Sequence, residues 1–142
     1  MYKKILIPID ISEQSSWRNA LPVAVDLAKA FGGQLHVTTI VRDVDAMWQT
    51  QYSLSAYEKM IDEAAARLNA IIDELVPQDL KPHSTVGHGN VFGEILRIAR
   101  DTGTELIVMA SHRPEMKDYL IGSNAARVVR HATCSVLVVR ES

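Results

Sequence analysis

The sequence predicts one α/β domain built on an open, five-stranded parallel sheet with helices on both faces. Short apolar runs rich in β-branched residues alternate with longer stretches in which apolar residues recur every three or four positions. No two apolar runs are joined by the short turn of a β-hairpin. This alternation is typical of a parallel sheet wound by right-handed crossovers.

The first half of the chain contains two predicted strands and one helix. The strands cover residues 5–9 and 35–41, both apolar enough to be buried on two faces. Between them we expect a helix over residues 15–31, which Pro22 either kinks or starts later. Gly32 and Gly33 end that helix.

The middle of the chain begins with a second helix. Ser55 and Glu58 have capping-box spacing, and the helix runs on until Pro77. A weak third strand lies within residues 82–86, followed by a turn over residues 87–90. Asn90 is the predicted cap of the next helix, and Gly103 its end.

The last part of the chain completes the sheet. Residues 106–110 form a fourth strand, and residues 111–121 a loop. A final helix begins at residues 122–124, and residues 136–139 form the fifth strand. We expect residues 1–142 to be a single domain without repeats or linkers.

Composition restricts the function classes. The formal net charge of −2 argues against a surface for nucleic acid or anionic membranes. No secretory-signal pattern opens the chain, and no apolar run is long enough to span a membrane. Cys134 is the only cysteine, which excludes an intrachain disulfide. We therefore expect a cytoplasmic protein that binds neither nucleic acid nor membrane.

Ligands of open parallel sheets bind beyond the carboxyl ends of the strands, where the strand order reverses. This rule selects Asp10, Ile40, Val41 and residues 110–113. The Asp10 carboxylate can accept hydrogen bonds from a ribose hydroxyl or a base amino group. Alternatively, Asp10 only caps the turn or helix that follows it.

A second candidate element is the start of the last helix, at Gly122, Ser123 and Asn124. Free N–H groups and the positive end of a helix dipole suit a phosphate, although an ordinary N-cap has the same sequence. Arg113 either contacts phosphate or lies in solvent. His112 beside it either donates a hydrogen bond or fills the turn.

Searches for catalytic patterns find none. The chain has no Gly-x-Ser-x-Gly elbow, no Gly-Lys-Ser/Thr phosphate loop and no dinucleotide fingerprint. The histidines show no metal-ligand spacing, and Cys134 has no nearby base, which favours a small buried residue over a nucleophile. We predict no catalytic residue and no metal site.

Both ends of the chain resemble the universal stress protein family. The resemblance rests on residues 4–10 (KILIPID) with Ser12, and on residues 122–132 and 134–139, and it extends over essentially the whole chain. It implies the strand order 3-2-1-4-5 of the adenine nucleotide alpha hydrolase-like fold. It further implies ATP or AMP as ligand, with magnesium as a candidate companion.

In such proteins the residue matching Asp10 contacts the adenosine, and those matching Pro8 and Ile40 line the base pocket. The resemblance also implies a homodimer paired through the fifth strands, by Val136, Leu137, Val138 and Val139. It places the nucleotide on Pro8, Ile9, Asp10, Ile40, Val41, Met109, Ala110, Ser111, His112, Arg113, Gly122, Ser123 and Asn124.

The phosphate loop departs from the family pattern Gly-x2-Gly-x9-Gly-Ser/Thr. Ala110 stands at the first glycine, the second is absent, and the loop is one residue shorter. Its Ser-His-Arg-Pro sequence, residues 111–114, resembles a branch of short, single-domain members. Either Arg113 and the amides of residues 122–124 rebuild the phosphate cradle, or phosphate binding is lost.

The leading hypothesis is a stress-response module that binds ATP or AMP as a regulatory ligand, with at most slow ATP hydrolysis. The alternative is a nucleotide-free protein-interaction module of the same fold. A third hypothesis is an enzyme of the wider hydrolase or electron-transfer flavoprotein-like group, which rapid, metal-dependent ATP turnover would reveal.

Overall fold

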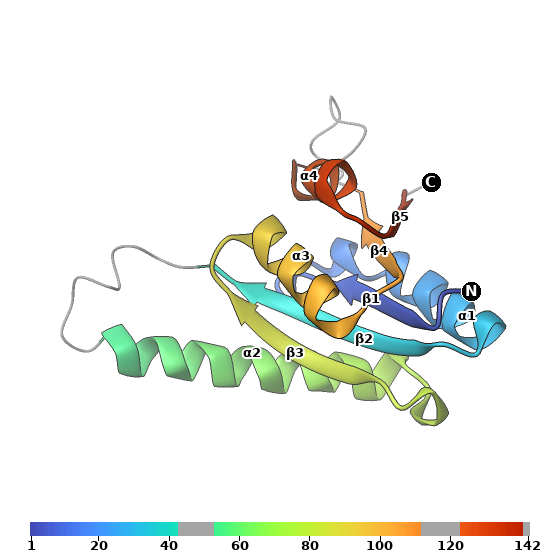
Figure 1. Cartoon of the computed structure of the whole chain (residues 1–142). Helices are drawn as coiled ribbons and strands as arrows, with labels where there is room; N and C mark the ends of the chain where they lie inside the picture. Colours follow the sequence, from blue (N-terminus) through green and yellow to red (C-terminus); the bar gives the residue numbers. More distant parts are fainter. Residues whose placement is uncertain (43–52, 112–122, 141–142) are drawn as a thin grey trace.

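The computed structural model describes residues 1–42, 53–111 and 123–140. Within this part of the chain, five parallel strands form one sheet in the order β3-β2-β1-β4-β5 (Figure 1), which confirms the expected order. The strands are β1 (Lys4–Pro8), β2 (Gln34–Val41), β3 (His83–His88), β4 (Leu106–Ala110) and β5 (Ser135–Val139). The helices are α1 (Ala20–Phe31), α2 (Ser53–Leu75), α3 (Val91–Thr102) and α4 (Ser123–His131), with short 3-10 helices η1 (Gln14–Ser16) and η3 (Gln78–Leu80).

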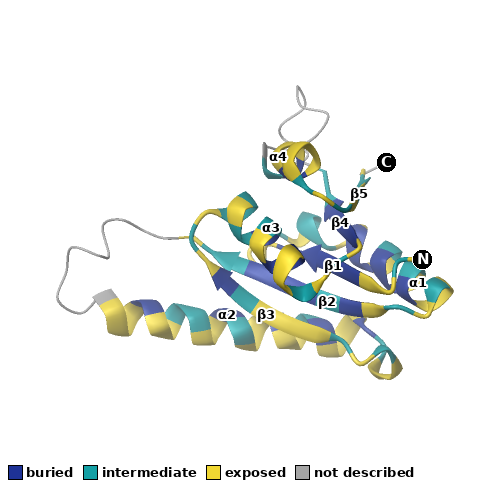
Figure 2. Cartoon of the chain, viewed as in Figure 1, coloured by how far each residue is buried: buried dark blue, intermediate teal, exposed yellow. Residues whose placement is uncertain are grey.

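Two apolar layers lie on opposite faces of the sheet, and β1 contributes to both. Ile5 packs in one cluster with buried residues of α1 and with Leu68 of α2. Leu6 belongs to the other cluster, with Ile95 of α3 and Val128 of α4. Figure 2 shows the buried strands in the interior and exposed residues on the outer sides of the helices. Burial on both faces explains why β1 is a continuous apolar run.

Helix α1 begins later than residue 15. A 3-10 turn covers Gln14–Ser16, and α1 starts at Ala20, so Pro22 is its third residue. A proline in the first turn removes an N–H that has no acceptor within the helix, and it is tolerated there. Of the two predicted effects of Pro22, the later start is therefore the one observed. Gly32 ends the helix in the left-handed region, at a φ of 61°.

Helix α2 begins at Ser53, so Ser55 lies inside it and the predicted capping box of Ser55 and Glu58 is wrong. Residues three apart also lie next to each other on the surface of a helix interior. Ser-x-x-Glu spacing therefore does not by itself mark the start of a helix. The caps of α3 are confirmed. The Asn90 side chain accepts a hydrogen bond from the Gly93 N–H at 3.0 Å. Gly103 ends α3 at a φ of 68°.

Strand β3 extends to His88, so Gly87 and His88 belong to the strand and not to the predicted turn. Parallel pairing with β2 continues through this segment, with Gly87 opposite Ile40. A Cβ atom at Gly87 would lie 2.8 Å from Ile40 Cδ1. Gly87 therefore permits close packing within the strand. A glycine in the sequence does not distinguish such a strand position from a turn.

Strand β5 lies at one edge of the sheet, as expected, and pairs only with β4 among the described strands. Its residues are exposed or half-buried, and Leu137 is 37% exposed. None of the described helices has the length and apolarity needed to cross a membrane.

Two histidines lie opposite each other on β2 and on the edge strand β3. His36 of β2 is directly opposite His83 of β3, and their rings stack with centroids 6.3 Å apart. His36 also hydrogen-bonds the Thr85 hydroxyl through Nε2. Burial, and then the charge of His83, lower the pKa of His36 below its ordinary value of 6.5. The folded protein therefore disfavours the protonated imidazole relative to the unfolded chain.

This shift predicts a loss of stability in mild acid. The contribution of His36 to the free energy of unfolding is fully present above the pKa of its imidazole in the unfolded chain. This contribution is lost as the pH falls from about 6.5 toward the lower pKa of the folded protein. Urea unfolding at pH 7.5 and 5.5 should show a smaller pH-dependent loss for His36→Gln than for the wild type. The exposed His131 gives a matched control, because His131→Gln should retain the wild-type loss. Equal losses in His36→Gln and the wild type would contradict this explanation.

Candidate functional site

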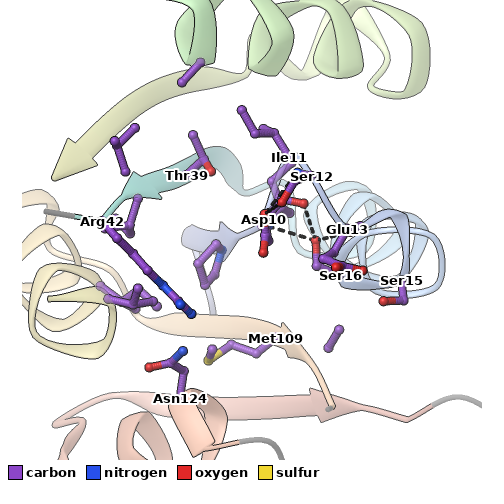
Figure 3. A pocket seen from close by; sticks show the side chains of 18 of the residues that line it. Asp10, Ile11, Ser12, Glu13, Ser15, Ser16, Thr39, Arg42, Met109 and Asn124 are labelled. Atoms are coloured by element: carbon purple, nitrogen blue, oxygen red, sulfur yellow. Dashed lines mark hydrogen bonds between the residues drawn. The ribbon is translucent and has the colours of Figure 1, made fainter. Parts of the chain in front are cut away.

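A pocket of about 720 Å³ lies at the carboxyl ends of β1, β2 and β4. Figure 3 shows side chains of this pocket, which come from strand ends, from η1 and from the helices on both faces of the sheet. Nine residues named from the sequence line it: Pro8, Ile9, Asp10, Ile40, Val41, Met109, Ala110, Ser111 and Asn124. His112, Arg113 and Gly122 lie outside the described residues. Ser123 begins α4, but its side chain is also outside the description.

Asp10 lies two residues beyond the end of β1 and organises the turn that leaves the sheet. Its Oδ1 accepts hydrogen bonds from the Ser12 N–H at 3.0 Å and from the Ser12 hydroxyl at 2.6 Å. Asp10 is therefore a turn-forming residue, which was one of its two predicted roles. The side chain is nevertheless exposed at the pocket, and within the described part of the chain Oδ2 has no protein partner. Oδ2 can accept a hydrogen bond from a ligand.

Ser16 stabilises the same turn from η1. Its hydroxyl accepts a hydrogen bond from the Asp10 N–H at 2.8 Å and lies 2.9 Å from the Asp10 carbonyl. It also donates to the Glu13 carbonyl at 2.7 Å. Sequence reasoning did not select Ser16. The available signal was the serine-rich segment after β1, because serine hydroxyls bond nearby backbone groups in turns.

Helix α2 supplies a wall of the pocket that sequence reasoning missed. Met60, Glu63, Ala64 and Arg67 line the pocket, and their three- and four-residue spacing places them on one helical face. The Arg67 Nη2 donates a hydrogen bond to the Ile11 carbonyl at 2.9 Å, which ties α2 to the turn that follows β1. The spacing was visible in the sequence, but the rule that ligands bind beyond the carboxyl ends of the strands does not select residues of a helix.

The end of β2 contributes apolar and charged groups. Thr39 is buried, and Ile40 and Val41 are half-buried beside the pocket. Arg42, the next residue, is exposed and also lines the pocket. Sequence reasoning stopped at Val41, although a cation directly after a strand near the reversal point was the signal for including Arg42.

On the opposite side, Ala110 continues β4 in register with Val139 of β5. The following residue, Ser111, donates its N–H to the Val139 carbonyl at 2.8 Å. Ala110 is not among the described non-glycine residues with a positive φ. An alanine at this position therefore carries no left-handed backbone strain, and the glycine of the family pattern is not needed for conformation there.

Charged groups at the pocket have both signs. Asp10, Glu13 and Glu63 supply carboxylates, and Arg42 and Arg67 supply guanidinium groups. Within the described residues, no group of three histidine, cysteine or acidic side chains is arranged to hold a metal ion. The pocket therefore suits a ligand with both hydrogen-bond donors and a negative charge.

Cys134 does not line this pocket. It packs against the apolar cluster on the α3 and α4 face of the sheet. Burial raises the pKa of its thiol, which keeps the thiol protonated at neutral pH. These features agree with a structural residue and not with a nucleophile.

Comparisons with known proteins point to one family. The sequence model described as the universal stress protein family matches residues 1–140. Universal stress protein G of Shigella flexneri is 30% identical over 145 residues, covering 99% of this chain and 100% of that protein. The structure of universal stress protein UspA from Lactobacillus plantarum is similar with a TM-score of 0.78, at 22% identity and with 98% of both chains covered.

A further similar structure is a universal stress protein in complex with cAMP. It has a TM-score of 0.62 and 20% identity, and the match covers 99% of this chain and 98% of that one. At these identities the structures support the fold. The family match extends over nearly the whole chain, and the strand order and the overall similarity to relatives agree with it. The chain therefore belongs to the universal stress protein family.

Proposed function

We propose that this protein binds an adenine nucleotide, ATP or AMP, in the pocket at the carboxyl ends of β1, β2 and β4. The observation that carries the proposal is the exposed Asp10 carboxylate at this pocket, with one oxygen free of protein partners in the described part of the chain. The volume of about 720 Å³ lies in the usual range for small-molecule sites. The complex of a similar protein with cAMP, itself an adenine nucleotide, supports the same ligand class.

In the proposed complex, Asp10 Oδ2 accepts a hydrogen bond from a ribose hydroxyl. Pro8 and the half-buried Ile40 and Val41 provide apolar contacts for the base. The phosphates lie toward the end of β4 and the start of α4, where Asn124 lines the pocket. Free N–H groups of a helix start stabilise phosphate oxygens there.

We assign the nucleotide a regulatory role with at most slow hydrolysis. Asp10 already organises a turn through two bonds to Ser12, so it is a poor candidate for a general base. Magnesium enters this proposal only as a companion of the triphosphate. The proposal treats residues 1–142 as one domain and includes a cytoplasmic location, in keeping with the single cysteine.

One observation favours the alternative of a nucleotide-free interaction module. Ala110 adds a side chain at the pocket where the family pattern has glycine. A methyl group reduces the space for a close approach of phosphate to the backbone. Binding measurements on the intact protein distinguish the two functions.

The role of Asp10 can be tested by substitution. The Asp10→Ala variant should bind a fluorescent ATP analogue about tenfold more weakly than the wild type, because a charge-assisted hydrogen bond is lost. Asp10→Asn keeps an acceptor for Ser12 and should retain the turn, yet bind more weakly than the wild type. Fluorescence anisotropy measures the affinities.

Asp73 on α2 provides the matched control, because it is exposed and does not line the pocket. Asp73→Ala should bind like the wild type. Absence of binding to the wild-type protein would refute the nucleotide proposal and leave the interaction module as the explanation. Unchanged binding by Asp10→Ala would remove Asp10 from the site.

We further propose a homodimer in which the β5 edges of two copies pair in antiparallel orientation. Ser135 donates its N–H to the Glu105 backbone carbonyl at 3.3 Å, and the Val139 carbonyl accepts from the Ser111 N–H at 2.8 Å. These residues direct their backbone groups toward β4. By strand alternation, Val136 and Val138 direct theirs away from the sheet. An unpaired row of this kind is a template for a second strand.

This geometry predicts that Val138→Pro shifts the protein from dimer to monomer. Proline removes an outward N–H while it leaves the N–H groups that serve β4. Size-exclusion chromatography with light scattering should show half the wild-type mass at micromolar concentration, with circular dichroism confirming the fold. Val129→Lys, at an exposed apolar position on α4 and not on β5, should stay dimeric. A monomeric wild type, or a dimeric Val138→Pro protein, would contradict the proposed interface.

A further inference from the structure

Arg42 is the one arginine at the pocket without a hydrogen bond or ion pair in the described part of the chain. The other arginine of the pocket, Arg67, donates to the Ile11 carbonyl at 2.9 Å. Arg42 directly follows β2 and is exposed. Within the described residues, its guanidinium donors have no protein acceptor and can bond to a ligand.

Asp10 and Arg42 lie on different sides of the pocket. In Figure 3, Asp10, Ser12 and Glu13 gather at one side, and the Arg42 side chain extends from the end of β2 toward the side where Met109 and Asn124 lie. The Asp10 carboxylate thus lies away from the Arg42 guanidinium, and the other arginine of the pocket, Arg67, is bonded to the Ile11 carbonyl in the Asp10 turn. A ligand with hydroxyl or amino donors at one end and a negative charge at the other matches this arrangement.

A second positive element lies on the same side as Arg42. Asn124 stands in the first turn of α4, a helix of nine residues. The first N–H groups of a helix lack acceptors within it, and its dipole is positive at this end. Arg42 follows β2 and Asn124 lies in α4, so the fold brings a guanidinium and the positive end of a helix dipole to one side of the pocket.

We propose that Arg42 determines specificity by binding the phosphate of the nucleotide, so that the pocket prefers nucleotides to the uncharged nucleoside. This inference rests on the proposed nucleotide function. The planar guanidinium can donate two parallel hydrogen bonds to phosphate oxygens. Arg42 thereby adds a full positive charge to the backbone N–H groups at the start of α4.

Isothermal titration calorimetry of AMP and adenosine tests the proposal on the wild type, Arg42→Gln and Arg42→Lys. Arg42→Gln should weaken AMP binding about tenfold, because it removes a charge-assisted contact. Adenosine affinity should change by less than about twofold, since adenosine has no phosphate for the guanidinium to contact. Arg42→Lys should bind AMP with intermediate affinity, because lysine keeps the positive charge but lacks the planar pair of donors of the guanidinium. The wild-type preference for AMP should also decrease at high salt.

Arg100 is the matched control, since it is an exposed arginine in the last turn of α3 and does not line the pocket. Arg100→Gln should retain the wild-type preference for AMP. Equal losses of AMP and adenosine affinity in Arg42→Gln would overturn the proposal, because they would indicate a contact with the base or a structural role. Unchanged AMP binding would overturn it as well. A wild-type protein that binds neither compound would refute the nucleotide function itself. This result differs from those that would overturn only the role of Arg42.

Discussion

The pairing of β1 with both β2 and β4 is the constraint on which the site depends. Because all three strands are parallel, their carboxyl ends meet at one edge of the sheet and bring Asp10, Arg42 and Ser111 to one pocket. The strand order reverses at β1, so the chain crosses to different faces on its two sides. The covering helices therefore separate at this point and leave a crevice. The buried apolar residues on both faces of β1 hold this arrangement in place.

Within that crevice, the turn after β1 combines a structural and a functional role. One oxygen of Asp10 is held by Ser12, and the backbone of the turn is held by Ser16 and Arg67. The remaining carboxylate oxygen is thus fixed in position before a ligand arrives, which reduces the entropy lost on binding. Arg42 stands at the other side of the pocket with its donors unused by the described residues. The two charges define the polarity of the ligand that we propose.

The sequence predicted the fold more completely than the site. Strands buried on two faces have a clear apolar signal, and β4 begins and ends where expected. Errors arose where one pattern fits two structures, as with Ser55 inside α2 and Gly87 inside β3. The rule that ligands bind beyond the carboxyl ends of strands found most pocket residues of the sheet, but it missed Thr39 and Arg42 at the end of β2. It also missed Arg67 of α2, because the packing of a helix against a turn is not encoded in strand positions. The predicted roles of His112, Arg113 and Gly122 stay predictions, since these residues lie outside the described part of the chain.

A crystal structure of the protein with AMP tests the central claim most directly. We predict a ribose hydroxyl within hydrogen-bond distance of Asp10 Oδ2, with the phosphate on the side of Arg42 and Asn124. A nucleotide bound in the reverse orientation, with its phosphate near Asp10 and Glu13, would contradict the proposed polarity. A pocket that stays empty at saturating AMP would contradict the nucleotide function, while the fold and the family would stand.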